Sequence, residues 1–156
     1  MIAEEIIDSI VEKYIQNTEY YEESLNELMD SQPALLAFLT QESSEVLTEE
    51  EKDIAWYLVL IIIRSCQAGE INIEELADVF LSENEETNWE VYQETPKGFF
   101  RDRITPLFKN YEQEDLLAFV EDSLEIDDDS PITPVGREVV FIMTKSVIDT
   151  IFKIKK

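Results

Sequence analysis

The sequence gathers positive charge in one stretch, TPKGFFRDRITPLFKNY, which covers residues 95–111. Its four cations are Lys97, Arg101, Arg103 and Lys109. In a helix, Lys97 and Arg101 would lie one turn apart and could face the same anion, with two phenylalanines between them for apolar contact. Lys97, Arg101 and Arg103 are therefore a candidate site for a phosphate, a carboxylate or an acidic peptide. The competing interpretation, which the charge balance favours, pairs these cations with carboxylates of neighbouring helices.

The chain contains no histidine, and this absence removes whole classes of chemistry. Imidazole-dependent serine and cysteine triads, zinc sites of cysteine and histidine, and Glu-x-x-His di-iron bundles all need that residue. The single cysteine, Cys66, ends an apolar run and has no imidazole to activate it. We therefore interpret it as a buried structural thiol.

An acidic loop near the C-terminal end of the sequence matches a calcium-binding loop only in part. Asp127, Asp129 and Glu138 occupy the first, third and twelfth positions of an EF-hand frame. Pro131 and Ile132 stand where that frame needs an oxygen ligand and a glycine. We interpret the aspartates as negative charge ahead of a helix N-terminus, and predict no metal site.

Catalysis by carboxylates or by a nucleotide cofactor finds little support in the sequence. Close carboxylate pairs arise by chance among 36 acidic residues, and nearly all of these residues lie on predicted polar faces. The three glycines cannot form a GxGxxG or GxxxxGK phosphate loop. The sequence predicts no cofactor and favours a non-enzymatic protein.

Acidity is the strongest compositional feature, because 36 acidic and 12 basic residues give a net charge of -24. Such a field repels nucleic acids and anionic lipids, so we expect no direct binding to either. It speeds association with a basic protein, as an inhibitor, an immunity-like protein or a mimic of nucleic acid requires. We predict an interaction module that docks a basic partner through acidic helix faces, particularly those around residues 4–27 and 42–53. In the competing interpretation the acidity serves solubility alone.

Two further functions stay open at this stage. The protein could bind a small anionic ligand, or act as an enzyme, through the patch of Lys97, Arg101 and Arg103. It could also be a homodimeric scaffold, because two strongly apolar helices present more surface than a small bundle readily buries.

The length and the apolar content predict a single acidic all-helical domain over residues 1–156. Hydrophobic residues make up 44% of the chain, which argues against disorder despite the charge. The acidic start of the sequence lacks the positive charge of a secretory signal. The unbroken apolar run, residues 54–63, is about half the length that a membrane span needs. We expect a cytoplasmic protein and not a membrane protein.

Apolar residues recur at helical spacing through most of the chain, so the predicted fold class is all-α. We expect an irregular helical bundle, or a two-layer helical array, of about 7–8 helices. Two of them should be central and apolar, over about 49–67 and 134–154. Thr48 and Glu51 form a capping box for the first, and Gly69 is placed to end it in the left-handed conformation.

The remaining helix boundaries rest on short local signals. Asn17 and Thr18 cap a second helix, Pro33 opens a short third one, and residues 112–124 predict another. Asn72 with Glu75 predicts a start, whereas the polar stretch SENEETN, residues 82–88, is typical of a loop. Three Thr-Pro pairs also predict helix starts: Thr95-Pro96, Thr105-Pro106 and Thr133-Pro134.

Overall fold

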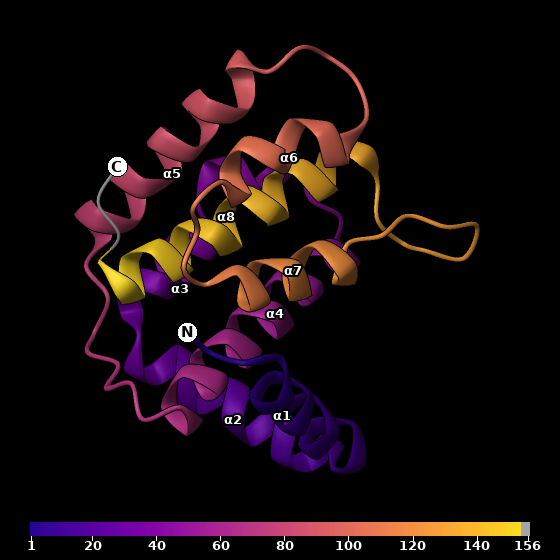
Figure 1. The fold of residues 1–156 in the computed structure, drawn as a ribbon. Helices are drawn as coiled ribbons and strands as arrows, with labels where there is room; N and C mark the ends of the chain where they lie inside the picture. Colours follow the sequence, from indigo (N-terminus) through magenta and orange to yellow (C-terminus); the bar gives the residue numbers. More distant parts are fainter. Residues whose placement is uncertain (154–156) are drawn as a thin grey trace.

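Two apolar helices, α4 (Glu49–Ala68) and α8 (Pro134–Phe152), pack on each other in the middle of the molecule (Figure 1). The structure is a computed structural model that describes residues 1–153, without the side chains of residues 42 and 43. Residues 139–150 of α8 are buried without interruption, and most of α4 beyond Ala55 is buried too. The two predicted central helices are therefore confirmed, although residue 154 lies outside the described residues.

Six further α-helices and one 3₁₀ helix cover this pair in the described residues, which contain no strand. In chain order they are α1 (Glu4–Gln16), α2 (Thr18–Ser31), α3 (Pro33–Leu39), η1 (Glu42–Val46), α5 (Asp78–Glu94), α6 (Phe100–Phe108) and α7 (Glu114–Ser123). In Figure 1, α5, α6 and α7 lie around α8, and α1 and α2 lie together at one end. The predicted all-α class is confirmed.

One buried carboxylate joins the starts of the two central helices. Thr48 accepts a hydrogen bond from the Glu51 amide, and Glu51 Oε1 accepts one from the Thr48 amide at 2.9 Å, so the predicted capping box is present. Glu51 Oε2 also accepts hydrogen bonds from the amide and the hydroxyl of Thr133, the cap residue of α8. Burial disfavours the charge of Glu51, but these hydrogen bonds outweigh it and lower the pKa of the carboxyl.

The region before and within α5 differs from the prediction. No helix starts at Asn72, because residues 71–77 form a non-helical segment and α5 begins only at Asp78. The polar stretch 82–88, predicted as a loop, lies inside α5. Its glutamates are good helix formers that mostly face solvent, and its last residue, Asn88, is buried against α8. A polar sequence therefore forms a helix here because its buried polar group finds partners across the interface.

Two of the three Thr-Pro pairs were wrong as helix starts. Thr95 caps the end of α5 instead, donating from its hydroxyl to the Tyr92 carbonyl, and α6 begins at Phe100. Pro106 lies inside α6, in the last turn before the helix ends. Thr133 does start a helix, because its hydroxyl accepts a hydrogen bond from the Gly136 amide.

The end of α4 also differs in detail from the prediction. Gly69 caps the helix at φ -84°, which is not left-handed, and the left-handed conformation falls on Glu70 at φ 66°. The chain still leaves α4 within two residues, because the Ile71 amide returns to the Cys66 carbonyl. Among residues 1–153, no helix is long and apolar enough to cross a membrane.

Candidate binding surfaces and a buried polar cluster

Arg101 and Arg103 of the predicted anion site are both engaged by carboxylates of other helices. Arg101 pairs with Glu121 of α7 and lies over the Phe108 ring, 5.1 Å from its centroid. Arg103 pairs with Glu138 of α8 at 3.4 Å and is largely covered. The interpretation that these cations relieve repulsion between helices therefore has direct support in both contacts.

The surroundings of Arg103 hold its guanidinium in a fixed position. Its Nε donates to the Thr95 hydroxyl at 3.1 Å, one terminal nitrogen donates to the Tyr92 carbonyl, and the group lies 3.9 Å from the Tyr92 ring centroid. The Tyr92 hydroxyl donates to Glu138, and burial together with that neighbouring charge raises the pKa of Tyr92. Arg103 thus cross-links the end of α5 to α6 and α8.

Lys97 does not share a helix with Arg101. It is exposed in the loop between α5 and α6, so the expected spacing of one helical turn is wrong. Burial raises the pKa of Glu121, and the charge of Arg101 offsets that rise only in part. Anion binding by Lys97, Arg101 and Arg103 stays a prediction, and the two arginines would have to exchange an existing carboxylate for the anion.

The neighbouring helices α1 and α2 carry a strongly acidic surface. Nine exposed carboxylates project from them: Glu4, Glu5, Asp8, Glu12, Glu19, Glu22, Glu23, Glu27 and Asp30. Lys13 is the one basic residue of these two helices, and Arg64 of α4 pairs with Glu27 at 3.5 Å. Ile15 and Tyr20, on either side of the turn between the helices, are both exposed. The sequence pattern alone predicted this surface.

A groove of about 1200 Å³ lies between the segment 72–77, the start of α5 and the end of α8. Ile73, Phe80 and Ile151 give it an apolar lining, and the Phe80 side chain is 56% exposed. Its charged lining residues are Glu74, Glu75, Glu83 and Lys153. No sequence signal found this groove, because it forms only where a non-helical segment passes two helices distant in the chain.

The segment that forms one wall of the groove is held by a single buried glutamine. Gln32, which follows α2 directly, donates from Nε2 to the Glu74 carbonyl at 3.1 Å and accepts from the Leu76 amide at 2.8 Å. A side-chain amide that binds the backbone carbonyl of one residue and the backbone N–H of the residue two positions later makes the same hydrogen bonds as a neighbouring strand makes to an extended chain. Gln32 therefore holds residues 74–76 in strand-like form and ties the groove to the end of α2.

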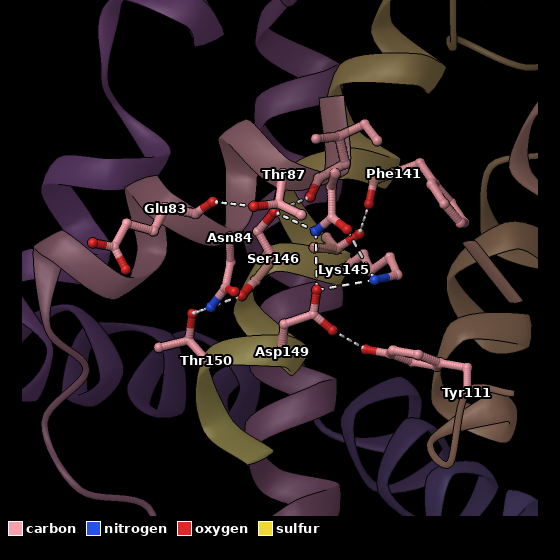
Figure 2. Close-up of polar contacts among 12 residues, drawn as sticks. Glu83, Asn84, Thr87, Tyr111, Phe141, Lys145, Ser146, Asp149 and Thr150 are labelled. Atoms are coloured by element: carbon pink, nitrogen blue, oxygen red, sulfur yellow. Dashed lines mark hydrogen bonds and ion pairs between the residues drawn. The ribbon is translucent and has the colours of Figure 1, made fainter. Parts of the chain in front are cut away.

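A buried polar cluster joins α5 to α8 near the groove (Figure 2). Lys145 Nζ lies 2.9 Å from both Asn88 Oδ1 and Asp149 Oδ2, and Lys145 and Asp149 are 4% and 0% exposed as side chains. The Asn88 amide nitrogen donates to Asp149 Oδ2 and to the Ser146 hydroxyl, each at 3.0 Å. Tyr111, in the loop between α6 and α7, closes the cluster by donating to Asp149 Oδ1 at 2.5 Å.

The sequence analysis did not identify this cluster and singled out neither Lys145 nor Asp149. The signal was present: opposite charges four residues apart on a helix face that is otherwise apolar point to a buried pair. Burial and the Asp149 charge raise the pKa of Tyr111, so its hydroxyl stays a proton donor. The lining of the groove includes neither Lys145 nor Asp149, and the hydrogen bonds of the cluster join α5 to α8.

The other sequence candidates lie in structural positions. Cys66 is fully buried, and burial raises the pKa of its thiol to about 12, which suppresses thiolate chemistry. The loop that carries Asp127 and Asp129 projects from the body of the molecule, and Asp127 accepts a hydrogen bond from the Asp129 amide (Figure 1). Glu138 is held by Tyr92 and Arg103. Among the side chains that the structure describes, no three potential metal ligands come together.

Comparison of the chain with protein-family models, with curated proteins and with solved structures gives no match.

Proposed function

We propose that the protein is a non-enzymatic interaction module that docks a basic protein on its acidic surface. The observation that carries this proposal is the face of α1 and α2, where nine exposed carboxylates accompany a single lysine. The summed field of these carboxylates steers a cationic partner toward the two helices before contact. The range of that field is about 8 Å at physiological ionic strength, so docking depends on salt.

Two features at the turn between α1 and α2 favour a protein as the partner over a small cation. Ile15 is 74% exposed, and Tyr20 is exposed while it stacks on Tyr14 with the ring centroids 5.1 Å apart. Rigid aromatic and aliphatic groups inside a charged surface are the kind of contact that carries affinity in protein interfaces. A partner with a basic surface around an apolar centre complements this arrangement.

The proposal is tested by capture from the native cell extract on the immobilised protein, with elution by stepwise salt and identification by mass spectrometry. The triple variant Glu19→Gln, Glu22→Gln, Glu23→Gln removes three charges from α2. The matched control Glu86→Gln, Glu90→Gln, Glu94→Gln removes the same charge from exposed positions of α5. We expect a basic protein that elutes from the α2 variant at clearly lower salt than from the wild type and the control.

Two results would count against the proposal. If both triple variants shift elution equally, net charge alone governs the binding and the α1 and α2 face has no special role. If no protein elutes sharply from the wild type, the acidity serves solubility. If a basic protein does elute, duplex DNA is tested as a competitor for it. Displacement by DNA indicates mimicry of nucleic acid, and no displacement indicates another kind of docking.

A further inference from the structure

We propose that the groove between residues 72–77, α5 and α8 binds an extended segment of the partner, in which basic and apolar residues alternate. This inference rests on the proposed function, because it places part of the same basic partner at a defined site. Its volume of about 1200 Å³ exceeds that of most small-ligand pockets and suits several residues of a chain.

The charge of the groove selects a cationic occupant. Glu74, Glu75 and Glu83 line it, Lys153 is the one cation of the lining, and all four are exposed. None of the three glutamates takes part in an ion pair within the described residues. Lysine or arginine side chains of a partner would gain charge-assisted hydrogen bonds to them without displacing an internal cation.

The apolar lining selects a polypeptide over a small polyamine. Phe80 is more than half exposed, and Ile73 and Ile151 lie beside it in the groove. A polyamine offers this surface little that is apolar to bury. A strand whose side chains alternate in direction can turn apolar residues toward Phe80 and basic residues toward the carboxylates.

The backbone of the groove wall supplies the remaining contacts. Gln32 pairs with the Glu74 carbonyl and the Leu76 amide, so in a strand-like chain the amide and carbonyl of Glu75 point to the opposite side. Neither of these two groups of Glu75 makes a hydrogen bond to another part of residues 1–153. An incoming strand can pair with this edge, which is the mode of strand addition in peptide recognition.

The test uses a fluorescein-labelled peptide, (Lys-Val)4 with blocked ends, and fluorescence anisotropy with the intact protein at low salt. We expect Glu75→Lys combined with Glu83→Lys to weaken binding at least tenfold. The control, Glu90→Lys combined with Glu94→Lys, makes the same charge change on exposed residues of α5 outside the groove and should change binding less than twofold. Circular dichroism verifies that each variant is folded.

A second peptide, (Lys-Ser)4, separates apolar recognition from charge. The wild type should bind it at least fivefold more weakly than (Lys-Val)4, and Phe80→Ala should abolish that preference. Amide chemical-shift changes on adding (Lys-Val)4 should concentrate in residues 72–77. Three results would overturn the inference. The first is equal weakening by both double variants, and the second is no preference between the two peptides. The third is competition by spermidine against (Lys-Val)4 at the same concentration as (Lys-Ser)4.

The two proposals fail in different ways. If the groove variants leave (Lys-Val)4 binding unchanged while capture from the extract still depends on the α2 carboxylates, the groove inference falls and the proposed function stands. If the peptide binds the groove as expected but no basic protein is captured, the proposed docking on α1 and α2 falls instead.

Discussion

At the scale of single residues, the Glu51 side chain ties the starts of the two central helices together. One oxygen completes the capping box of α4, and the other accepts two hydrogen bonds from Thr133 at 2.8 and 2.9 Å. The carboxylate approaches α8 so closely that a Cβ placed on Gly136 would lie 1.8 Å from Glu51 Oε2. The position of the Glu51 carboxylate, and not the backbone conformation of residue 136, therefore favours glycine there.

This geometry predicts that Gly136→Ala destabilises the protein, although alanine is normally the better helix residue by about 1 kcal/mol. The Glu51 carboxylate must swing away and give up its bonds to Thr133, so we expect a net loss of about 1–3 kcal/mol. In a Glu51→Ala background the obstacle is gone, and the same change should be neutral or stabilising. Urea unfolding of the four proteins in this cycle measures the coupling. A cost that is the same in both backgrounds would show that Glu51 is not the obstacle.

Two carboxylates with opposite pKa shifts predict opposite pH dependence. The pKa of Glu51 is lowered, so its ionised form stabilises the fold at neutral pH, and this contribution is lost as pH falls through the lowered value. Burial raises the pKa of Glu85, with the hydrogen bonds from Gln41 opposing that rise, so ionised Glu85 costs stability at neutral pH. Relative to the wild type, Glu51→Gln should therefore destabilise at pH 7, and Glu85→Gln should stabilise.

Both differences should shrink on acidification, because a protonated carboxyl resembles the amide that replaces it. The Glu85→Gln difference should vanish first, below its raised pKa and near the ordinary value of 4.5, whereas the Glu51→Gln difference should persist to lower pH. Chemical unfolding of the three proteins from pH 7 down to the lowest pH at which they stay folded tests this order. Differences that do not change with pH would rule out ionisation as their origin.

At the scale of the elements, the interface between α5 and α8 is organised by the cluster around Lys145 and Asp149. Asn88 comes from α5. Lys145 and Asp149 come from α8, and Tyr111 comes from the loop after α6 (Figure 2). Buried charges are tolerated only where geometry and further hydrogen bonds compensate for lost hydration. This requirement fixes one arrangement of α5 on α8, because a shift of either helix would separate the partners.

The cluster predicts strong coupling between its two charges. Lys145→Met and Asp149→Asn should each cost about 3–5 kcal/mol, since each leaves the opposite charge buried without its ionic partner. The double variant should cost much less than the sum, because no buried charge remains. Guanidinium unfolding of the wild type, both single variants and the double variant gives the coupling energy. Additive costs would mean that the two charges are stabilised independently of each other.

The same elements show what the sequence could and could not predict. Caps with a local mechanism were correct at Asn17, Thr48 and Thr133, since each depends only on contacts within three residues. The start of α5 was wrong because Gln32, distant in the chain, holds residues 74–76 in strand-like form. Its polar stretch was read as a loop because the partners of Asn88 lie on α8.

The candidate sites divide along the same line. The acidic face of α1 and α2 follows from periodicity within two consecutive helices, so the sequence predicted it. The groove needs the relative positions of α5, α8 and the segment between α4 and α5, which no local pattern encodes. The engagement of Arg101 by Glu121 and of Arg103 by Glu138 depends likewise on packing between separate helices. The sequence did predict that these cations pair with carboxylates of neighbouring helices, but which carboxylates they contact depends on packing.

At the scale of the whole molecule, the charge is far from balanced by internal pairing. Five ion pairs occur in the described part of the chain, and they engage Glu27, Glu49, Glu121, Glu138 and Asp149. Against 36 acidic residues in the sequence, this leaves most carboxylates to interact with solvent and with one another. Most of the arginines form ion pairs that join helices. They neutralise carboxylates at these contacts, so the rest of the outer surface stays acidic.

This imbalance predicts that sodium chloride stabilises the fold. Exposed like charges repel more strongly in the compact state than in the unfolded chain, and salt screens that repulsion beyond about 8 Å at physiological ionic strength. A gain of about 1 kcal/mol between low and physiological salt would raise Tm by about 2–4 °C for a chain of this size. Thermal unfolding followed by circular dichroism in increasing sodium chloride measures it. A falling Tm would mean that attractive ion pairs outweigh the repulsion between like charges. It would contradict the unneutralised acidic field on which the proposed docking of a basic partner depends.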